Sequence, residues 1–400
     1  MTDVQKPNLQ FIIIVALLTA MVAMSIDTML PALGIIAHEL GAAHENDRQL
    51  VITLFFAGMT LGTLVSGPVS DSTGRKPAII GSLCFYLVGA AMCAFSGSFT
   101  MLLVGRFIQG FGAAGPRIVA IAMVRDGYKG AAMAQVMSFV MSVFMLVPII
   151  APSVGQLVLF AGSWRLIFLG FIGMASIAGL LLYFRQPETL KREYRQPFAL
   201  ATIAQAAVAV VTNPVALGYT LAGGCIFGGF IAYVGTSQQI FAEQYNQGDW
   251  FALWFGAFAL ALALAMMLNA RLVVRYGMRK LSKWALRAEI ILSAIFFVLS
   301  LIYHGHPPLI TLGVYLFCNF FCCGILFGNY NAIAMEPMGR IAGMASAISG
   351  ALSTLLALVS GSLIGRLYDG TVMSLVGGYL GLGILAFLCT EWAERRRRKA

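Results

Sequence analysis

Apolar residues occur along this chain in long, nearly uninterrupted runs, separated by short clusters of glycine, proline and charged residues. Each run holds roughly twenty residues, the length that an α-helix needs to cross ~30 Å of hydrocarbon. Cutting the runs at the polar clusters predicts twelve membrane spans, at residues 10–31, 50–70, 77–96, 100–122, 132–157, 164–184, 214–236, 249–270, 283–303, 308–333, 342–364 and 371–391. The spans must be helices, because backbone polar groups in lipid have to be hydrogen-bonded within the segment.

Composition supports the same conclusion of an all-α polytopic membrane protein. Of the 400 residues, 60% are hydrophobic and 10% are charged, and the mean hydropathy is +0.86. No soluble fold has enough interior to bury so much apolar surface.

The seven cysteines fall within predicted spans and indicate packing residues, not a disulfide framework. His304 and His306 lack further ligands nearby, so we expect neither a metal site nor a cofactor.

The net charge of +10 is explained by where the basic residues lie relative to these spans. With a cytoplasmic N-terminus, nearly all of them fall in loops on the inner side, and only Arg48, Arg165 and Arg366 fall in outer loops. Membrane proteins commonly show this asymmetry. The charge therefore predicts that both termini are cytoplasmic, and it does not indicate a nucleic-acid partner.

The longest polar stretch, residues 185–213, divides the chain into two blocks of six spans. It predicts a cytoplasmic linker between an N-terminal half (residues 1–184) and a C-terminal half (residues 214–400) with a basic tail. Residues 277–280 (GMRK) after the eighth span faintly repeat residues 74–76 (GRK) after the second. Such duplication is typical of transporters whose two halves rock around a substrate site near the bilayer midplane.

A short polar turn, GPVSDSTGRK, joins the second and third predicted spans. Its glycines permit close approach and positive φ. Its carboxylate can pair with the basic residues that follow, or cap the next helix. The candidate conformational residues of this turn are Gly67, Asp71, Gly74, Arg75 and Lys76. An ordinary charged turn is the alternative.

Asp27 is the only acid in the interior of the first predicted span. Counting from the cytoplasmic end at ~1.5 Å per residue places it in the outer third of the membrane. Charge is costly there, so the carboxyl needs a partner, a water-filled cavity or a proton. Asp27 is therefore a candidate proton-binding residue. Alternatively, it reaches the headgroups or caps a break at Pro31.

The fourth predicted span carries polar residues on one helix face. Arg106, Gln109, Gly110, Ala113 and Arg117 have helical spacing, and the opposite face is apolar. Arg106 lies at a depth similar to that of the acid in the first span. Arg117, about three turns deeper, either faces the cytoplasmic half of a cavity or extends to the membrane interface.

Two of these stretches resemble motifs of the major facilitator superfamily. The turn at residues 67–76 is similar to the loop G-x-L-x-D-R-x-G-R-R/K between spans 2 and 3 of that family. Val69 replaces the family's Leu, and Ser72 stands where the family usually has Arg. Residues 105–117 resemble the span-4 pattern R-x-x-Q-G-x-G.

A third stretch, residues 148–156, is similar to the antiporter motif G-x-x-x-G-P-x-x-G-G in the fifth span. Pro152 and Gly155 match it, and they are further candidate conformational residues. Other stretches resemble the Bcr/CflA group of drug:proton antiporters, namely residues 27–33, 124–126, 187–190 and 342–347.

The resemblance implies a major facilitator fold with two pseudo-symmetric six-helix halves. In that family spans 1 and 4 both face the central cavity, so Asp27 and Arg106 are predicted to be coupled partners in proton transfer. Gln109 and Arg117 share the face of Arg106 and are candidate substrate-binding residues.

The predicted seventh and tenth spans contribute polar and aromatic side chains but little charge. Tyr219, Tyr233 and Asn319 are candidate substrate-binding residues in a pocket suited to bulky amphiphilic molecules. The alternative is that these side chains only pack or face lipid.

Together these features favour a proton-coupled multidrug exporter, working as a monomer by alternating access in a bacterial inner membrane. A transporter of one anionic or zwitterionic metabolite is the alternative, because Arg106 and Arg117 suit a carboxylate or phosphate. An enzyme is not expected, because no nucleophile, base and metal set occurs at useful spacing. A channel is a further alternative, but the duplicated halves and the Asp/Arg pair favour alternating access.

Overall fold

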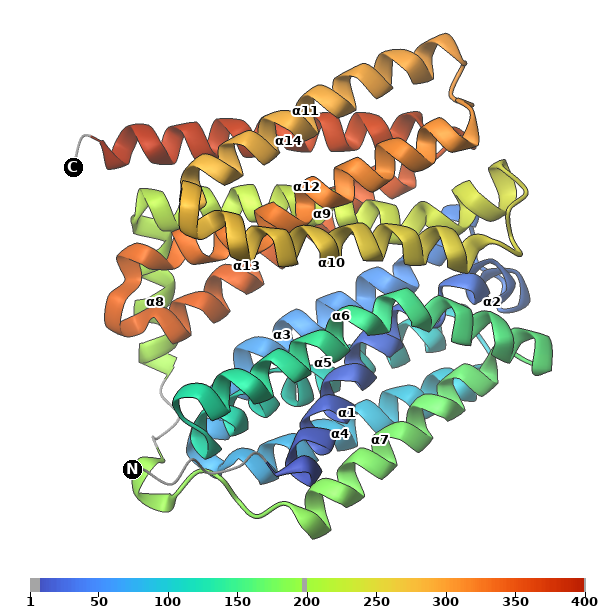
Figure 1. Ribbon diagram of the computed structural model, residues 1–400. Helices are drawn as coiled ribbons and strands as arrows, with labels where there is room; N and C mark the ends of the chain where they lie inside the picture. Colours follow the sequence, from blue (N-terminus) through green and yellow to red (C-terminus); the bar gives the residue numbers. More distant parts are fainter. Residues whose placement is uncertain (1–7, 196–199, 399–400) are drawn as a thin grey trace. The chain divides into compact units, whose positions relative to one another are not determined.

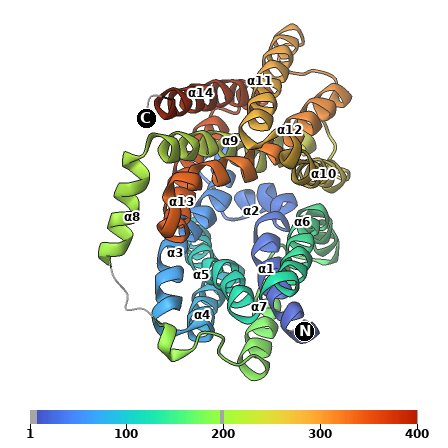
Figure 2. The same cartoon turned by 60° about the vertical axis from the view of Figure 1, so that its left-hand side comes forward.

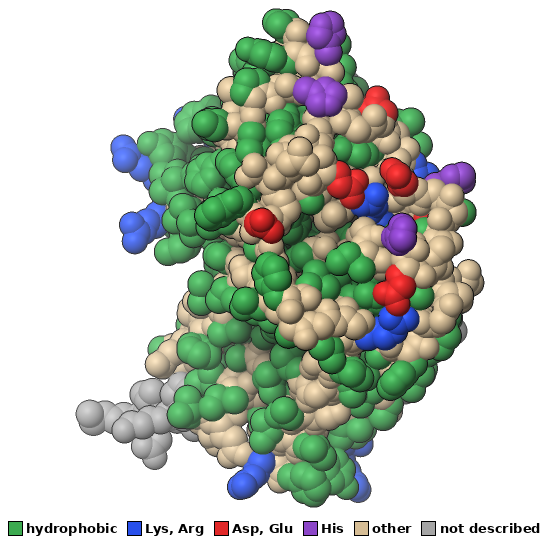
Figure 3. All heavy atoms as spheres, turned by 90° about the vertical axis from the view of Figure 1, so that its right-hand side faces the viewer, with side chains coloured by type: hydrophobic (Ala, Val, Ile, Leu, Met, Phe, Trp, Pro, Cys, Tyr) green, Lys and Arg blue, Asp and Glu red, His purple; other side chains and the backbone are tan. Residues whose placement is uncertain are grey.

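A computed structural model describes residues 8–195 and 200–398 (Figure 1). Within these ranges all regular structure is helical, and twelve segments are long and apolar enough to cross a membrane. The predicted all-α fold with twelve spans is therefore confirmed. Large apolar side chains are exposed along the helices, such as Val274 at 86% and Ile310 at 75%, and Figure 3 shows such side chains covering wide areas. So much exposed apolar surface is suited to lipid and not to water.

The chain forms two compact units. Unit 1 comprises Met1–Ala43 and Leu54–Ala199, and unit 2 comprises His44–Thr53 and Leu200–Ala400. The first helices are α1 (Leu9–Asp27), η1 (Leu30–Ala32), α2 (Leu33–Glu39), η2 (Glu45–Gln49), α3 (Leu50–Thr73), α4 (Arg75–Ala94), α5 (Phe99–Gly127), α6 (Gly130–Ala161), α7 (Arg165–Arg185) and η3 (Arg192–Tyr194). The later helices are α8 (Leu200–Thr212), α9 (Pro214–Gln238), η4 (Gln239–Gln244), α10 (Phe251–Tyr276), α11 (Met278–Ile302), α12 (Leu309–Met335), η5 (Glu336–Ile341), α13 (Ala342–Arg366) and α14 (Met373–Arg397).

In unit 1, α1 contacts α5, α6 and α7, while α4 packs along α5. Buried apolar side chains such as Leu18, Met21 and Phe168 fill the space between these helices. Polar side chains that enter this interior must therefore find partners on neighbouring helices.

The turn between α3 and α4 is tighter than the predicted polar loop at residues 67–76. α3 continues to Thr73 and α4 begins at Arg75, so Gly74 alone separates the two helices. Gly74 has φ +111°, a backbone conformation that favours glycine. The predicted second span, residues 50–70, included Pro68 correctly but ended before Asp71, because polar residues do not belong to an apolar run. The helix continues through these polar residues to Thr73.

In unit 2, α9 lies against α12, α13 and α14. α8 falls within the segment predicted as a linker; it meets the start of α9 at a steep angle and contacts α13 (Figure 2). Gly277 joins α10 to α11 with φ +78°. The turn at residues 277–280, predicted to repeat the GRK turn, thus has the same backbone feature: a single glycine with positive φ joins two helices.

Candidate functional site

Asp27 and Arg106 both lie inside unit 1. Asp27 is the last residue of α1 and is 6% exposed, while Arg106 on α5 is fully buried. Among the described residues, the Asp27 side chain makes no hydrogen bond or ion pair. Its predicted pairing with Arg106 is therefore not formed in this structure and stays a prediction.

Arg106 nevertheless reaches the same end of α1. Its Nη2 donates to the backbone oxygen of Ser25 at 3.1 Å, two residues before Asp27. Its Nη1 donates to Gln109 Oε1 at 2.7 Å, and its guanidinium lies 4.3 Å from the centroid of the Phe55 ring. An aromatic face stabilises a desolvated cation. The guanidinium is thus held at the last turn of α1, which ends at Asp27, at the depth that the helix spacing predicted.

Tyr86 of α4 completes this buried group through a hydrogen bond between its hydroxyl and Ser25 Oγ. We define the unit-1 polar cluster by its members, Ser25, Asp27, Tyr86, Arg106 and Gln109. It links α1, α4 and α5 inside the helical unit. Gln109, predicted to bind substrate, is fully buried here as a partner of the arginine.

Gly155 of α6 lies against the chain beside Asp27. A Cβ added at Gly155 would lie 1.8 Å from the backbone oxygen of Thr28, so the two backbones are in direct contact. Pro152 lies one turn earlier in α6 and is also buried. The two residues that match the antiporter motif therefore pack α6 against the end of α1 that carries the acid.

Arg117 lies farther along α5 than the unit-1 polar cluster. Its side chain is exposed, and its Nη1 lies 3.7 Å from Met59 Sδ. The other predicted members of this helix face, from Arg106 to Ala113, are buried. Of the two candidate substrate-binding residues in unit 1, Arg117 is therefore the exposed one and Gln109 the buried one.

The turn at Gly74 is held by charged side chains. Arg75 forms ion pairs with Asp71 and, at 2.8 Å, with Asp126 of α5. Lys76 Nζ donates to the backbone oxygen of Tyr183 in α7 at 2.6 Å. The pairing of Asp71 with Arg75 across the turn is confirmed. Gly67 is half-buried inside α3, away from the turn itself.

Glu188 supplies a contact that sequence reasoning missed. Its carboxylate accepts hydrogen bonds from the backbone N–H groups of Arg75 at 2.9 Å and Lys76 at 3.1 Å. These are the first residues of α4, where unpaired N–H groups and the helix dipole favour an anion. The sequence identified residues 187–190 and 124–126 only by their resemblance to the Bcr/CflA group. Their acids, Glu188 and Asp126, in fact fix the turn.

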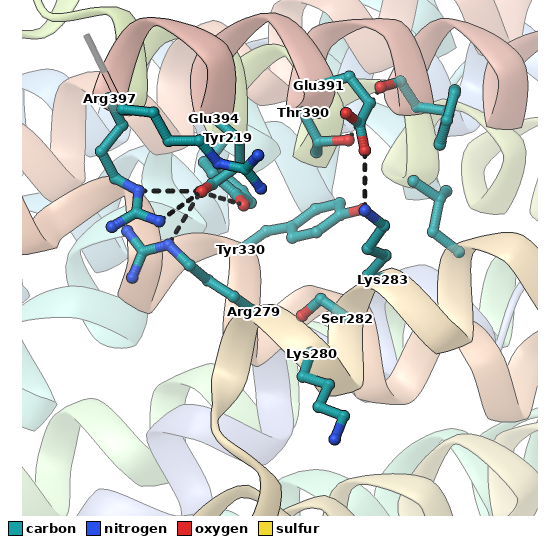
Figure 4. A pocket seen from close by; sticks show the side chains of 13 residues that line it. Tyr219, Arg279, Lys280, Ser282, Lys283, Tyr330, Thr390, Glu391, Glu394 and Arg397 are labelled. Carbon is teal, nitrogen blue, oxygen red and sulfur yellow. Dashed lines mark hydrogen bonds and ion pairs between the residues drawn. The ribbon is translucent and has the colours of Figure 1, made fainter.

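Tyr219 lies at one end of unit 2, beside a cavity of about 250 Å³ (Figure 4). Its hydroxyl donates to Glu394 Oε1 at 2.9 Å. Arg279 also bonds Glu394, at 2.8 Å, and pairs with Glu336 at 2.6 Å. Lys283 pairs with Glu391 at 3.2 Å on the other side of the cavity. Tyr219 is thus part of a charged network at the helix ends, and its predicted role in substrate binding stays a prediction.

Tyr233 and Asn319 are both fully buried in unit 2. The Tyr233 ring lies 4.8 Å from that of Phe320 and 5.8 Å from that of Phe255. Asn319 Nδ2 donates to Ser293 Oγ at 3.4 Å. The predicted aromatic character of this region is present, and these two side chains pack within it. Their role in substrate binding stays a prediction.

Glu289 is a buried acid that sequence reasoning did not single out. It lies in α11, is 1% exposed, and is close to Asn319. The sequence signal was an acid six residues into the predicted ninth span, next to the basic Arg287.

A second missed group belongs to unit 2 and includes residues 44–53. Arg48 forms an ion pair with Glu243 of η4 and donates to Gln238 Oε1 at 2.8 Å. Gln49 Nε2 donates to the backbone oxygen of Gly365 at 3.0 Å. These bonds anchor η2 to η4 and α13. No local sequence pattern indicates a contact between residues so far apart in the chain.

Comparison with known proteins agrees with this architecture. The family described as Major Facilitator Superfamily matches residues 15–361. The chain is 29% identical over 390 residues to a bicyclomycin resistance protein homolog of Haemophilus influenzae, covering 96% of each chain. It is also 29% identical over 329 residues to the multidrug resistance protein MdtL of Klebsiella pneumoniae, covering 81% of this chain and 80% of the relative.

A solved structure shares the fold. The xylose transporter XylE from E. coli superposes with a TM-score of 0.73, covering 96% of this chain and 97% of that chain. The sequence identity is 12%, so the likeness concerns the fold alone.

Proposed function

Because the chain belongs to the major facilitator superfamily, a family of membrane transport proteins and not of enzymes, we propose that it is a proton-coupled exporter of amphiphilic drugs. Two relatives carry names that refer to drug resistance, bicyclomycin in one case and multiple drugs in the other. Their similarity runs along most of the chain, which supports a related activity here.

The observation that carries the proton coupling is the Asp27 carboxyl. It is buried at the end of a membrane helix, and in the described part of the chain no cation is bonded to it. An ionised carboxylate in such a place is costly, whereas a neutral acid is tolerated. A second arrangement, in which the guanidinium of Arg106 pairs with Asp27, would stabilise the ionised form. Asp27 therefore suits a group that binds and releases a proton as its surroundings alternate.

In this mechanism Arg106 exchanges partners. It now bonds the backbone oxygen of Ser25, two residues before Asp27, and in the second state α1 and α5 are rearranged so that it meets the carboxyl. Proton binding at Asp27 removes the charge that Arg106 would pair with. The proton thus binds the two states with different affinity, and that difference drives the conformational change. Gly155 permits the close contact of α6 at this point.

The proposal sets the protein in a bacterial inner membrane, as a monomer with both termini in the cytoplasm. Protons enter from outside, and the drug is taken from the cytoplasm or the inner leaflet. Among the predicted substrate-binding residues, Arg117 is exposed and Tyr219 lines the cavity of Figure 4. Gln109, Tyr233 and Asn319 are fully buried and require rearrangement before they contact a solute.

The test uses inverted membrane vesicles energised with a proton gradient. Cationic, neutral and anionic drugs are added in turn to vesicles with wild-type protein, Asp27→Asn and the control Glu193→Gln, which neutralises an exposed acid outside the spans. We expect drug-evoked proton release from wild type and Glu193→Gln, and none from Asp27→Asn. Equal release from Asp27→Asn at equal expression would remove Asp27 from the mechanism.

A carrier of one anionic or zwitterionic metabolite is the second candidate. Arg117 supports it, because an exposed guanidinium in a membrane helix suits a carboxylate or phosphate. If no drug disturbs the gradient and a single metabolite saturates transport, this second function holds in place of drug export. Arg117→Gln would then raise the KM for the anion.

A further inference from the structure

Glu289 lies near the middle of a membrane helix. It is eleven residues from the start of α11 and thirteen from its end, which is ~16 Å along the axis from the first residue. The side chain is 1% exposed. Burying an ionisable side chain at this depth costs free energy, and residues of this kind in membrane helices usually have a function.

The neighbours of Glu289 are neutral. α12 presents Tyr315, Asn319, Cys322 and Cys323, and α14 presents Tyr379. Asn319 is within hydrogen-bonding reach of the carboxyl, and Glu289 Oε2 has no partner in the described residues.

No cation balances this carboxyl among residues 8–195 and 200–398. Arg287 lies two positions earlier, on the opposite and exposed side of α11. Lys283 is paired with Glu391. A buried carboxyl without a cation is stable chiefly as the neutral acid, so this site is suited to holding a proton.

α14 approaches the carboxyl closely at Gly383. A Cβ added there would lie 2.4 Å from Glu289 Oε2. The carboxyl therefore lies directly against the backbone of α14.

The cavity of Figure 4 lies at the end of unit 2 that carries Arg279. Ser282 and Leu286 line it from α11, seven and three residues before Glu289 and on the same helix face. Phe387 lines it from α14, one turn beyond Gly383. The inner end of the cavity is thus about one helical turn from the acid.

Two buried hydroxyls face this cavity. Ser282 Oγ and Tyr330 Oη both lie in its wall, each side chain is 2% exposed, and neither has a hydrogen-bond partner in the described part of the chain. A cavity of about 250 Å³ has room for several water molecules. Hydroxyls lining such a space can relay protons to water.

We propose that Glu289 is a second proton-binding site of this transporter, which exchanges its proton with solution through the cavity lined by Ser282 and Tyr330. Its part in transport rests on the proposed function, whereas proton binding itself does not. The exchange is a simple one, in which the carboxylic acid releases a proton to water in the cavity and the carboxylate takes one back.

Infrared spectroscopy of the purified full-length protein in lipid nanodiscs tests the binding of the proton. The carboxylic C=O stretch is recorded between pH 5 and pH 10, without drug, for wild type, Glu289→Gln and Glu289→Asp. We expect a neutral-acid band that Glu289→Gln lacks, that decreases as the pH rises, and that returns at a shifted frequency in Glu289→Asp. The aspartate variant keeps the test valid if the glutamine variant folds poorly.

Two spectral results would overturn the proposal. One is the absence of any Glu289-dependent acid band at every pH, which means a carboxylate that is always ionised. The other is a band that is constant at every pH where the protein is folded and that does not exchange with deuterium, which means a permanently neutral structural acid.

Proton counts in vesicles test the role in transport. If Glu289 carries a proton in each cycle, Glu289→Gln exports drug with about one proton per drug molecule in place of two, because only Asp27 still cycles. An unchanged proton count would overturn that role. If wild type shows no drug-evoked proton movement, the proposed function fails, while the spectral result for Glu289 stands independently.

Discussion

The Glu188 carboxylate accepts a hydrogen bond from the backbone N–H of Arg75 at 2.9 Å, so a residue after α7 caps the N-terminus of α4. We expect Glu188→Ala to lower the free energy of unfolding by about 1 kcal/mol, as the loss of a helix cap does. Thermal unfolding in detergent measures the change. The control is Glu193→Ala, an exposed acid nearby, which should have no effect. Equal unfolding temperatures for the two variants would contradict the cap.

The left-handed turn at Gly74 makes a second prediction. In Gly74→Ala the residue must keep φ near +111°, and its Cβ would lie 2.5 Å from Glu188 Oε2. We expect a loss of ~1–2 kcal/mol in the free energy of unfolding. The matched control is Gly67→Ala, where a Cβ meets no atom within 4 Å and lies inside α3. That variant should be neutral or stabilising by up to ~1 kcal/mol.

Gly155 should tolerate even one added methyl group poorly. The Cβ in Gly155→Ala overlaps the backbone oxygen of Thr28 and forces α6 away from α1 beside Asp27. We expect a stability cost of ~1–3 kcal/mol and a strong reduction in proton-coupled transport. Gly173→Ala on α7, where the Cβ meets nothing, is the control. Normal drug-evoked proton release from Gly155→Ala would show that this contact is not needed.

The ion pair between Arg48 and Glu243 can be tested by exchanging the charges. Arg48 is buried, whereas the Glu243 side chain is 44% exposed, so solvent screens the pair and its direct contribution is ~1 kcal/mol. We expect Arg48→Glu and Glu243→Arg each to slow transport, and the double variant to recover part of the rate. A double variant slower than both single variants would exclude a specific pair. Drug efflux from cells at matched expression is the measurement.

The sequence predicted the helices well because crossing a bilayer requires a long apolar run, and such a run is recognised from consecutive residues without knowledge of the fold. It also placed Arg106 correctly, because helix spacing and depth are local properties. Arg106 indeed reaches the end of α1, at Ser25.

Contacts between distant segments could not be predicted in the same way. Glu188 follows Arg75 by 113 positions, and Glu243 follows Arg48 by 195. Only the fold brings these partners together. Glu289 was missed for a different reason. The nearby Lys283 and Arg287 make the start of α11 look like a charged interface, although the acid is on the buried face.

The buried acid of unit 2 has an electrical consequence. One elementary charge that crosses the membrane gains ~2.3 kcal/mol per 100 mV, which changes a steady-state concentration ratio on the order of fiftyfold. A transporter that exchanges one neutral drug for the proton of Asp27 moves one charge. With Glu289 cycling as well, the same export moves two. The voltage across the membrane would then sustain a far steeper drug gradient, even where the pH is equal on both sides.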